Sequence, residues 1–251
     1  MNAIMMHYPA NPERVATFER VRAACNGHVD VLVDYLGVGP VKMHRACWTV
    51  AKGAHSIVLQ DDLLPCRNLL QALDRIAEVL PNDPVCIYDM NISSLHTISK
   101  RGDVWRRMKC DNWGGSVMLP RSWISRILAW EKYAIVPQKD DAKVLSLYAQ
   151  AYDRFFYHTP QLLQHIGVYS TLHHGRVYSP SPWFVGETFD AMSIDWTRGV
   201  ETAYTEYVSL SLDFFENLTP NALEDWDSDA SLWRPGSVSA SLAPPRRSMI
   251  S

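Results

Sequence analysis

Apolar residues follow two different spacings along the first 90 positions of the chain. Short continuous apolar runs, which are typical of strands buried on both faces, alternate with stretches whose apolar residues recur every three or four positions, as in amphipathic helices. The runs predict strands over residues 3–7, 29–33, 56–60 and 85–89. The spaced patterns predict helices that begin at Pro12, Val41 and Leu69. Strands that alternate with helices form parallel sheets, so we expect an α/β fold with a mostly parallel sheet flanked by helices.

The first predicted helix has signals at both of its ends. Asn11 is a preferred capping residue, and Pro12 suits the first helical position because the N–H that it lacks would have no partner there. The pair Asn26-Gly27 is expected to end the helix, since both residues accept the left-handed backbone conformation that follows a last turn.

The pattern is less regular after about residue 95, and we expect an irregular C-terminal part. It predicts a strand over residues 116–119, helices over 122–132 and 142–152, and a strand over 161–166. The last segment is rich in Ser, Ala and Pro, which is typical of a mobile tail. We expect one domain over residues 1–195, an extension packed on it over 196–227, and the tail over 228–251.

Composition narrows the class of protein. The 251 residues contain 24 Lys and Arg against 27 Asp and Glu, so the formal net charge is −3. This balance excludes a protein that is basic throughout and coats nucleic acid by bulk charge, although a local basic patch remains open. The five cysteines form no CxxC pair, which favours a reducing compartment. With no leader and no membrane-length apolar run, we expect a cytoplasmic protein without a membrane span.

Acidic residues follow three of the predicted strands. Asp34 follows the second, the pair Asp61-Asp62 follows the third, and Asp89 ends the fourth. Ligands bind beyond the carboxyl ends of the strands in an open parallel sheet. Two adjacent carboxylates repel each other, and a divalent cation such as Mg²⁺ or Mn²⁺ would relieve that repulsion. The alternative is that one of the pair only caps the helix that follows.

Several stretches together resemble a known family. The segment His55-Ser-Ile-Val-Leu-Gln-Asp-Asp-Leu-Leu-Pro65 is similar to the acidic motif of nucleotide-sugar glycosyltransferases of the GT-A fold, which occurs as DxD, EDD or a close variant. Further stretches agree in order: Val33-Asp34 after the opening strand and helix, Trp113–Arg121, Asp140-Asp141, and Pro160–Gly167 with its P-x-L-x-Q-H-x-G pattern. The last pattern resembles small glycosyltransferases, some of them encoded by phages. The resemblance covers roughly residues 1–195, and Gln60 departs from the acid that is common there.

The resemblance implies a Rossmann-like fold and transfer of a hexose from a nucleotide-diphosphate sugar, UDP-glucose or a similar donor, to a hydroxyl group. A departing diphosphate needs a cation, so Asp62 is expected to hold Mn²⁺ or Mg²⁺ and His165 to be a second metal ligand. The alternative for His165 is a hydrogen-bonded core histidine. Asp34 and Asp61 are expected to hold the nucleoside, although Asp34 also suits an ordinary turn.

Other residues are assigned to the donor and to the proton transfer. Arg45 would bind a phosphate of the donor; the alternative is an ordinary arginine side chain that extends into solvent. The group Trp113, Gly114 and Gly115 would lie beneath the donor sugar, unless it is a tight turn beside a core ring. Inversion at the sugar carbon requires a base, for which we prefer Asp141 over Asp140. Both are also suited to starting the helix predicted over 142–152.

A basic segment at residues 100–109 suggests an acceptor. It contains Lys100, Arg101, Arg106, Arg107 and Lys109, and Trp105 lies among them. Charge interleaved with aromatic rings can grip phosphates and stack bases, so a hydroxymethylated pyrimidine in DNA is one candidate acceptor. A saccharide or a merely solvated loop are the alternatives. If the chain is phage-encoded, it would act in the host cytoplasm.

Two rival functions remain open. A nucleotidyltransferase could use the same pair of carboxylates, Asp61-Asp62, to bind a nucleotide triphosphate. It would need a further carboxylate near Asp62, for which Asp89 is the candidate. A non-catalytic module that binds nucleic acid or glycan on a decayed transferase fold would need no metal.

Overall fold

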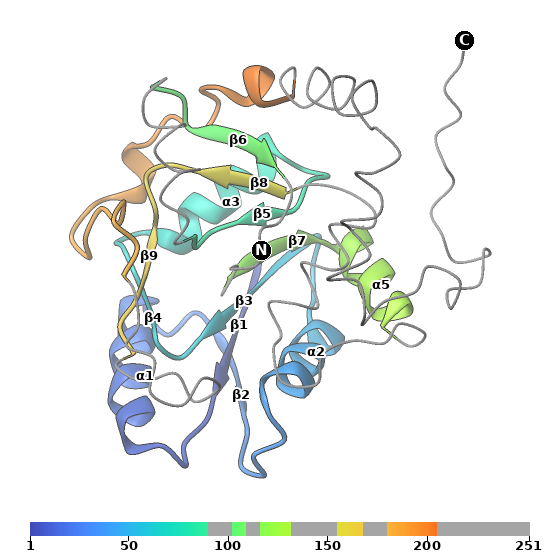
Figure 1. Ribbon diagram of the computed structural model, residues 1–251, viewed down its shortest axis with the longest axis vertical. Coiled ribbons are helices and arrows are strands. Elements are labelled where there is room, and N and C mark those ends of the chain that lie inside the picture. The colour runs from blue at the N-terminus through green and yellow to red at the C-terminus, as the bar shows by residue number, and fades with distance from the viewer. Residues whose placement is uncertain (90–101, 109–115, 132–154, 168–179, 205–251) are drawn as a thin grey trace, which may run out of the picture.

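The computed structural model describes residues 1–89, 102–108, 116–131, 155–167 and 180–204 (Figure 1). Its strands are β1 (Asn2–His7), β2 (Asp30–Val33), β3 (His55–Gln60), β4 (Leu63–Pro65), β5 (Val85–Cys86), β6 (Trp105–Met108), β7 (Val117–Pro120), β8 (Phe155–His158) and β9 (Leu163–His165). Its helices include α1 (Pro12–Ala24), α2 (Pro40–Val50), α3 (Leu69–Val79), α5 (Arg121–Trp130) and the short 3₁₀ helix η1 (Ala191–Ser193).

A seven-stranded sheet forms the centre, with strand order β2-β1-β3-β7-β5-β8-β6. The strands β1, β2 and β3 pair in parallel, as do β5 and β8, while β7 and β6 run against their neighbours. Because β7 is antiparallel to both β3 and β5, five of the strands point the same way. The prediction of an α/β fold with a mostly parallel sheet is therefore confirmed.

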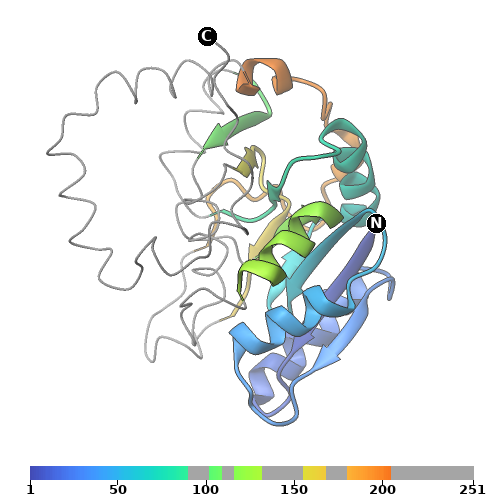
Figure 2. The ribbon, with the colours of Figure 1, turned by 90° about the vertical axis from the view of Figure 1, so that its right-hand side faces the viewer.

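Helices cover both faces of this sheet. The apolar faces of α1 and α3 pack on one side, and those of α2 and α5 pack on the other (Figures 1 and 2). Side chains of β1 alternate between the two layers: Ala3 and Met5 contact the first core, and Ile4 and Met6 contact the second. A strand that is buried on both faces must be apolar at every position, which explains the continuous runs in the sequence.

The ends of α1 follow the sequence signals. The helix begins at Pro12, and the amide of Arg14 donates to the carbonyl of Asn11 at 3.0 Å. After Ala24 the backbone turns into the left-handed region, with φ of 54° at Asn26 and 69° at Gly27. Because α1 begins shortly after β1 ends, the first turn of the helix lies directly beyond the carboxyl end of β1, beside the candidate site.

Three strands were not expected from the sequence. The strands β4, β6 and β8 have no counterpart among the predicted runs, and β5 is two residues long where five were predicted. Both β4 and β6 pair with segments far away in the chain, so local apolar spacing carries little information about them. The predicted helix over 142–152 lies outside the described residues.

A second, two-stranded sheet joins β4 to β9 in antiparallel register. Leu63 is paired with His165, and the amide of Ile166 donates to the carbonyl of Asp62 at 2.8 Å. This ladder fixes the segment that follows β3 against the segment around His165, although the two are far apart in sequence.

The described part of the C-terminal region packs on the domain. Trp196 is buried in the core on the side of α3, and its carbonyl accepts a hydrogen bond from Nε1 of Trp105 at 2.7 Å. Residues 205–251, which include the predicted tail, lie outside the described part of the chain. No helix among the described residues is long and apolar enough to span a membrane.

Candidate active site

The carboxyl ends of β1, β2 and β3 meet at one edge of the sheet. His7 is paired with Val33 across β1 and β2, and Met6 is paired with Gln60 across β1 and β3. The residues that continue these strands therefore lie side by side, among them Asp34 and the pair Asp61-Asp62. All three carboxylates are buried. This convergence is what a parallel arrangement of these strands predicts.

Both oxygens of Asp61 are bound by the protein. Oδ2 lies 2.8 Å from Nδ1 of His7 and accepts a hydrogen bond from the amide of Tyr8 at 3.1 Å. Oδ1 accepts a hydrogen bond from Nη1 of Arg14 at 2.6 Å. The ring of His7 is in turn stacked on Phe18 of α1, with 4.0 Å between ring centroids. Asp61 thus ties the end of β1 to the start of α1.

Asp62 is fully buried beneath the same edge. Its Oδ2 lies 2.6 Å from Nη1 of Arg14 and 3.1 Å from Nε2 of His165. Burial, the strongest influence on this group, would raise its pKa, but the contact with His165 and the charge of Arg14 outweigh it and hold the pKa below its ordinary value. The carboxylate is therefore charged at neutral pH, and the guanidinium of Arg14 balances its charge.

Arg14 is a residue of this site that the sequence did not point to. The repulsion between the two carboxylates, which a metal ion was predicted to relieve, is relieved in the structure by this guanidinium, with one nitrogen 2.6 Å from each carboxylate. Burial lowers the pKa of Arg14, but the charges of Asp62 and Asp61 more than offset that effect. The available signal was its position in the first turn of a helix that starts directly after β1.

His165 and Asp62 have a spacing that suits a metal ion. Two neighbouring ligands of an octahedral ion, each about 2.1 Å from it, are about 3 Å apart, and Oδ2 of Asp62 lies 3.1 Å from Nε2 of His165. Gly167 adjoins the pair so closely that a Cβ there would lie 2.7 Å from Oδ2 of Asp62. The described residues contain no group of three or more His, Cys, Asp or Glu able to hold a metal. Diphosphate oxygens and water would complete the shell of Mg²⁺ or Mn²⁺, so the two donors fit such an ion.

A cavity of about 300 Å³ opens at this edge. Its lining comprises Met6, His7, Tyr8, Arg14, Asp34, Gly37, Gly39, Pro40, Met43, Gln60, Asp61 and His165. Asp62 lies beneath it, in contact with two of the lining residues, Arg14 and His165. The cavity is therefore lined both by residues that follow β1 and β3 and by the loop that follows β2.

Asp34 shapes that loop. Its two oxygens accept hydrogen bonds from the amides of Val38 at 3.0 Å and Gly39 at 3.2 Å. Gly37 lies against the ring of Tyr8, and both Gly37 and Gly39 have positive φ. The turn role that was the alternative for Asp34 is present in the structure. Because Asp34 also lines the cavity, a contact with a nucleoside remains a prediction.

Other predicted residues lie elsewhere. Arg45 is not among the residues that line the cavity; its Nε lies 3.5 Å from Glu131, whose pKa is raised by burial against the opposing charge of Arg45. The residues Trp113, Gly114, Gly115, Asp140 and Asp141 lie outside the described part of the chain. Their roles at the donor sugar and as the base remain predictions.

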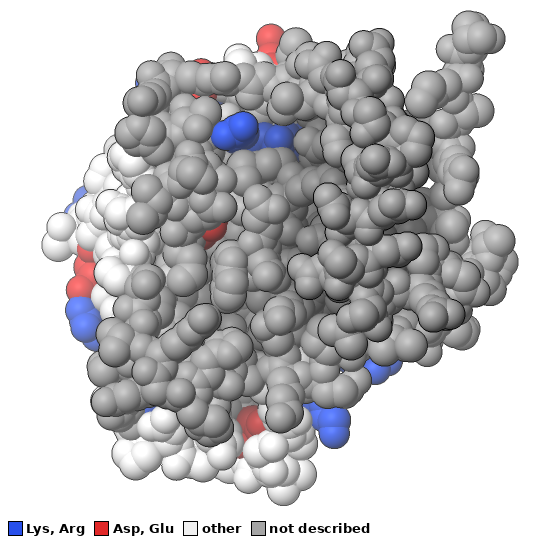
Figure 3. All heavy atoms as spheres, in the orientation of Figure 1, with Lys and Arg blue, Asp and Glu red and all other residues white. Residues whose placement is uncertain are grey.

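The basic segment is only partly available to an acceptor. Trp105 is buried, with its ring edge against Phe156 and His158, and so cannot stack on a base. Nη2 of Arg107 lies 3.6 Å from Oδ1 of Asp83, and its guanidinium covers the ring of Phe156. These two findings correct the prediction that Trp105 stacks on a base and that Arg107 binds a phosphate of DNA. On the face shown in Figure 3, the described Lys and Arg side chains occur in separate small groups.

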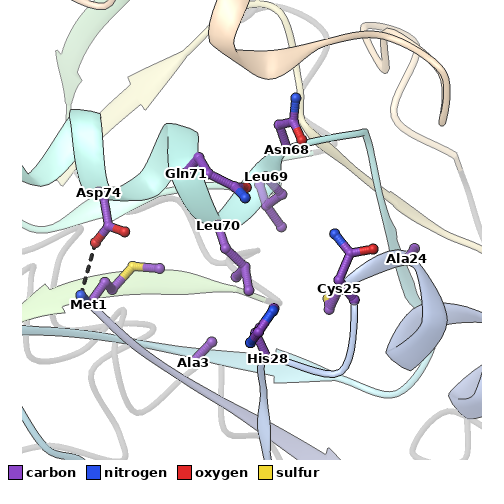
Figure 4. A pocket seen from close by; sticks show the side chains of 11 residues that line it. Met1, Ala3, Ala24, Cys25, His28, Asn68, Leu69, Leu70, Gln71 and Asp74 are labelled. Atoms are coloured by element: carbon purple, nitrogen blue, oxygen red, sulfur yellow. Dashed lines mark hydrogen bonds and ion pairs between the residues drawn. The ribbon is translucent and has the colours of Figure 1, made fainter.

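A second cavity, of about 230 Å³, lies at the opposite end of β1 (Figure 4). It is bordered by the end of α1, the start of α3 and side chains such as His28 and Asp74. Asp74 is the only carboxylate among its lining residues, and it is paired with the amino group of Met1. The carboxylate cluster therefore marks the other end of the strand as the candidate active site.

No protein-family model and no curated protein sequence matches the chain. Among solved structures, it is similar to the protein A197 from STIV, with 13% identity and a TM-score of 0.41 over 66% of this chain and 86% of that one. It is also similar to S. aureus TarS 1–349 in complex with UDP-GlcNAc, with 10% identity and a TM-score of 0.41 over 70% of this chain and 60% of that one. A third structure, a glycosyltransferase involved in the glycosylation of the major capsid of PBCV-1, has 12% identity and a TM-score of 0.35 over 66% and 94%.

Proposed function

We propose that this chain is a metal-dependent glycosyltransferase of the GT-A type, which moves a hexose from a nucleotide-diphosphate sugar, with UDP as the nucleotide, to a hydroxyl acceptor. One observation carries the proposal: a fully buried carboxylate, Asp62, lies 3.1 Å from the imidazole of His165 beside a cavity at the carboxyl ends of three parallel strands. A buried carboxylate must have a partner; in this structure Arg14 is that partner, and Asp62 and His165 together offer an oxygen and a nitrogen donor to an ion.

We assign different parts of the donor to different residues at this edge of the sheet. Asp62 and His165 would hold Mn²⁺ or Mg²⁺, which when bound neutralises charge on the departing diphosphate. Asp61 is held by His7 and Tyr8 and presents a fixed carboxylate to the cavity. The loop organised by Asp34 would receive the nucleoside, since Asp34, Gly37 and Gly39 line the cavity.

The transfer itself requires one bond to form as another breaks. The acceptor oxygen attacks the anomeric carbon, the bond from that carbon to the diphosphate oxygen breaks, and the nucleoside diphosphate leaves with the electron pair. We assign the proton of the acceptor hydroxyl to Asp141, with Asp140 as the alternative, which gives inversion at the sugar carbon. Hydroxymethylated DNA and saccharides are the acceptors to be compared.

The geometry favours this function over a nucleotidyltransferase. A two-metal site needs several carboxylates around the first, but both oxygens of Asp61 are engaged by the protein, and Asp89 is not among the residues that line the cavity. Asp62 and His165 offer one carboxylate and one imidazole, which suit a single ion, and Oδ2 of Asp62 also contacts Arg14.

The test is release of UDP from a panel that includes UDP-glucose and UDP-GlcNAc, with Mn²⁺ present. The wild-type chain should release UDP slowly without an acceptor and faster with hydroxymethylated DNA or an oligosaccharide, which should gain the mass of one transferred sugar residue. Asp62→Asn should lower turnover by about 10³-fold, since it removes charge stabilisation from the metal.

The matched control is Asp30→Asn, which makes the same change at an exposed carboxylate at the start of β2. It should retain wild-type turnover. If Asp62→Asn stays folded and releases UDP as fast as the wild type, the site is misassigned. If no nucleotide sugar is cleaved while the chain still binds DNA or glycan, the non-catalytic module is the better description.

A further inference from the structure

Arg14 occupies a position that conflicts with the proposed metal ion. Its Nη1 lies 2.6 Å from Oδ2 of Asp62, the same oxygen that lies 3.1 Å from Nε2 of His165. A divalent ion held by these two residues would bind Oδ2 at about 2.1 Å. Two cations on one buried oxygen repel each other strongly, because little water is present to screen them.

Arg14 has a second anchor that would remain. The same Nη1 lies 2.6 Å from Oδ1 of Asp61, and Asp61 is itself held by the amide of Tyr8 and the ring of His7. The guanidinium could therefore turn away from Asp62 without losing all of its compensation. It also lines the cavity in which the diphosphate of a donor would lie, and a planar guanidinium binds phosphate oxygens well.

We propose, on the basis of the function proposed above, that Arg14 is a counter-cation that the metal ion must displace from Asp62, and that the donor diphosphate then takes up the displaced guanidinium. In the absence of substrate, Arg14 keeps the carboxylate pair charged and in place. Binding of the ion releases Arg14, and the diphosphate provides its new partner. Metal and nucleotide therefore bind cooperatively, and each must strengthen the binding of the other by the same factor.

The coupling can be measured without any turnover. The affinity for Mn²⁺ is determined from the electron paramagnetic resonance signal of free Mn²⁺, first with the protein alone and then with saturating UDP. Arg14→Gln should bind Mn²⁺ alone at least fivefold more tightly than the wild type, because its competitor is gone. The factor by which UDP strengthens Mn²⁺ binding should fall at least fivefold. Direct contact between Mn²⁺ and UDP is common to both proteins, so this difference reports on Arg14.

Two further variants control the result. Arg14→Lys keeps the charge but cannot bridge both carboxylates as a planar group, so its Mn²⁺ affinity should lie between those of the wild type and Arg14→Gln. It also provides the comparison if Arg14→Gln fails to fold. Arg20→Gln, on the same helix, removes an arginine that pairs with Glu187 outside the cavity and should match the wild type.

The outcomes separate the two proposals. If Mn²⁺ binds the wild type and the Arg14 variants bind it equally or more weakly, with unchanged coupling to UDP, Arg14 is not a competing cation and only this inference fails. If Mn²⁺ binds none of the proteins, with or without UDP, the metal-dependent function fails and this inference fails with it.

Discussion

Two histidines on the segment 155–167 lie in opposite surroundings. His158 is fully buried between the rings of Trp105 and Trp196, with centroids 5.6 and 5.4 Å away, and its Nδ1 lies 2.7 Å from the carbonyl of Pro160. His165 lies at the cavity beside the carboxylate of Asp62. Burial lowers the pKa of His158 to about 4, against the smaller opposing effect of the Pro160 carbonyl, so its ring is neutral and serves packing.

The two rings differ both in burial and in partner, since His158 is enclosed by indole rings and His165 contacts a carboxylate at a cavity. A ring among indoles can only pack, and it donates one hydrogen bond to the backbone. A ring that shares a carboxylate oxygen with an arginine at a cavity wall has a nitrogen directed at the place where a cation would bind. Substitutions at the two histidines and at their neighbours test this contrast.

His165→Ala should lower sugar transfer by about 10³-fold, or about 4 kcal/mol, because it removes one of the two protein ligands of the metal. The melting temperature should change little, since water from the cavity can fill the space. Initial rates of UDP release and a thermal melt measure the two effects. His158→Phe should show the opposite behaviour, with turnover per folded molecule close to that of the wild type. Equal losses of turnover in both variants would remove the contrast.

Stability should fall as the pH is lowered through the range set by His158. The unfolded chain binds a proton on this residue near pH 6.5, whereas the folded chain does not until about pH 4. The unfolded state is therefore favoured increasingly over that range, by at most about 3 kcal/mol. Urea unfolding between pH 7 and pH 4.5 measures this loss, which His158→Phe should abolish. Asp62 affects stability in a lower pH range. Its pKa is lowered in the folded state, so stability is lost as the pH falls below about 3.8, the ordinary pKa of this group. A wild-type curve that is flat between pH 6.5 and 4.5 would contradict the assignment.

Gly167→Ala should lower turnover about tenfold by displacing the proposed metal ligands. Its Cβ would lie 2.7 Å from Oδ2 of Asp62 and 2.8 Å from Cε1 of His165, and Asp62 has no exposed surface into which it could move. Affinity for Mn²⁺ should fall together with turnover. Wild-type Mn²⁺ binding in this variant would show that the two side chains are not held in contact.

Asp34→Asn should have the smallest effect, a rise of about fivefold in the KM for the nucleotide sugar with little change in kcat. Asparagine has a single acceptor oxygen, so one of the two amides that Asp34 binds, those of Val38 and Gly39, would lose its partner. Steady-state kinetics over a range of donor concentrations measures this effect. A fall in kcat with an unchanged KM would place Asp34 closer to the reacting atoms than the structure indicates.

The first half of the fold could be predicted because its signals are local. Continuous apolar runs identify β1, β2 and β3, and the Asn11-Pro12 step identifies the start of α1. The convergence of Asp34, Asp61 and Asp62 then follows from parallel topology alone. The sequence could not place β6 and β8, because their positions depend on pairing with distant strands.

The site could be predicted only in part, because some of its residues meet through strand pairing between distant segments. Asp62 and His165 meet because β4 pairs with β9, which the sequence did not predict. The resemblance to a family implied only that the two residues would bind the same ion. Arg14 was missed because an arginine in a first helical turn is ordinary by itself. Its role depends on two carboxylates that lie in the same place only after β1 and β3 have paired.

The ladder between β4 and β9 also sets the time at which the site can form. During synthesis, Arg14 and the two carboxylates leave the ribosome early, whereas the imidazole that completes the site follows about a hundred residues later. A growing chain therefore carries an incomplete centre while about a hundred residues are added. Any metal-binding ability of the growing chain would be acquired only near the end of folding, when the sheet is otherwise in place.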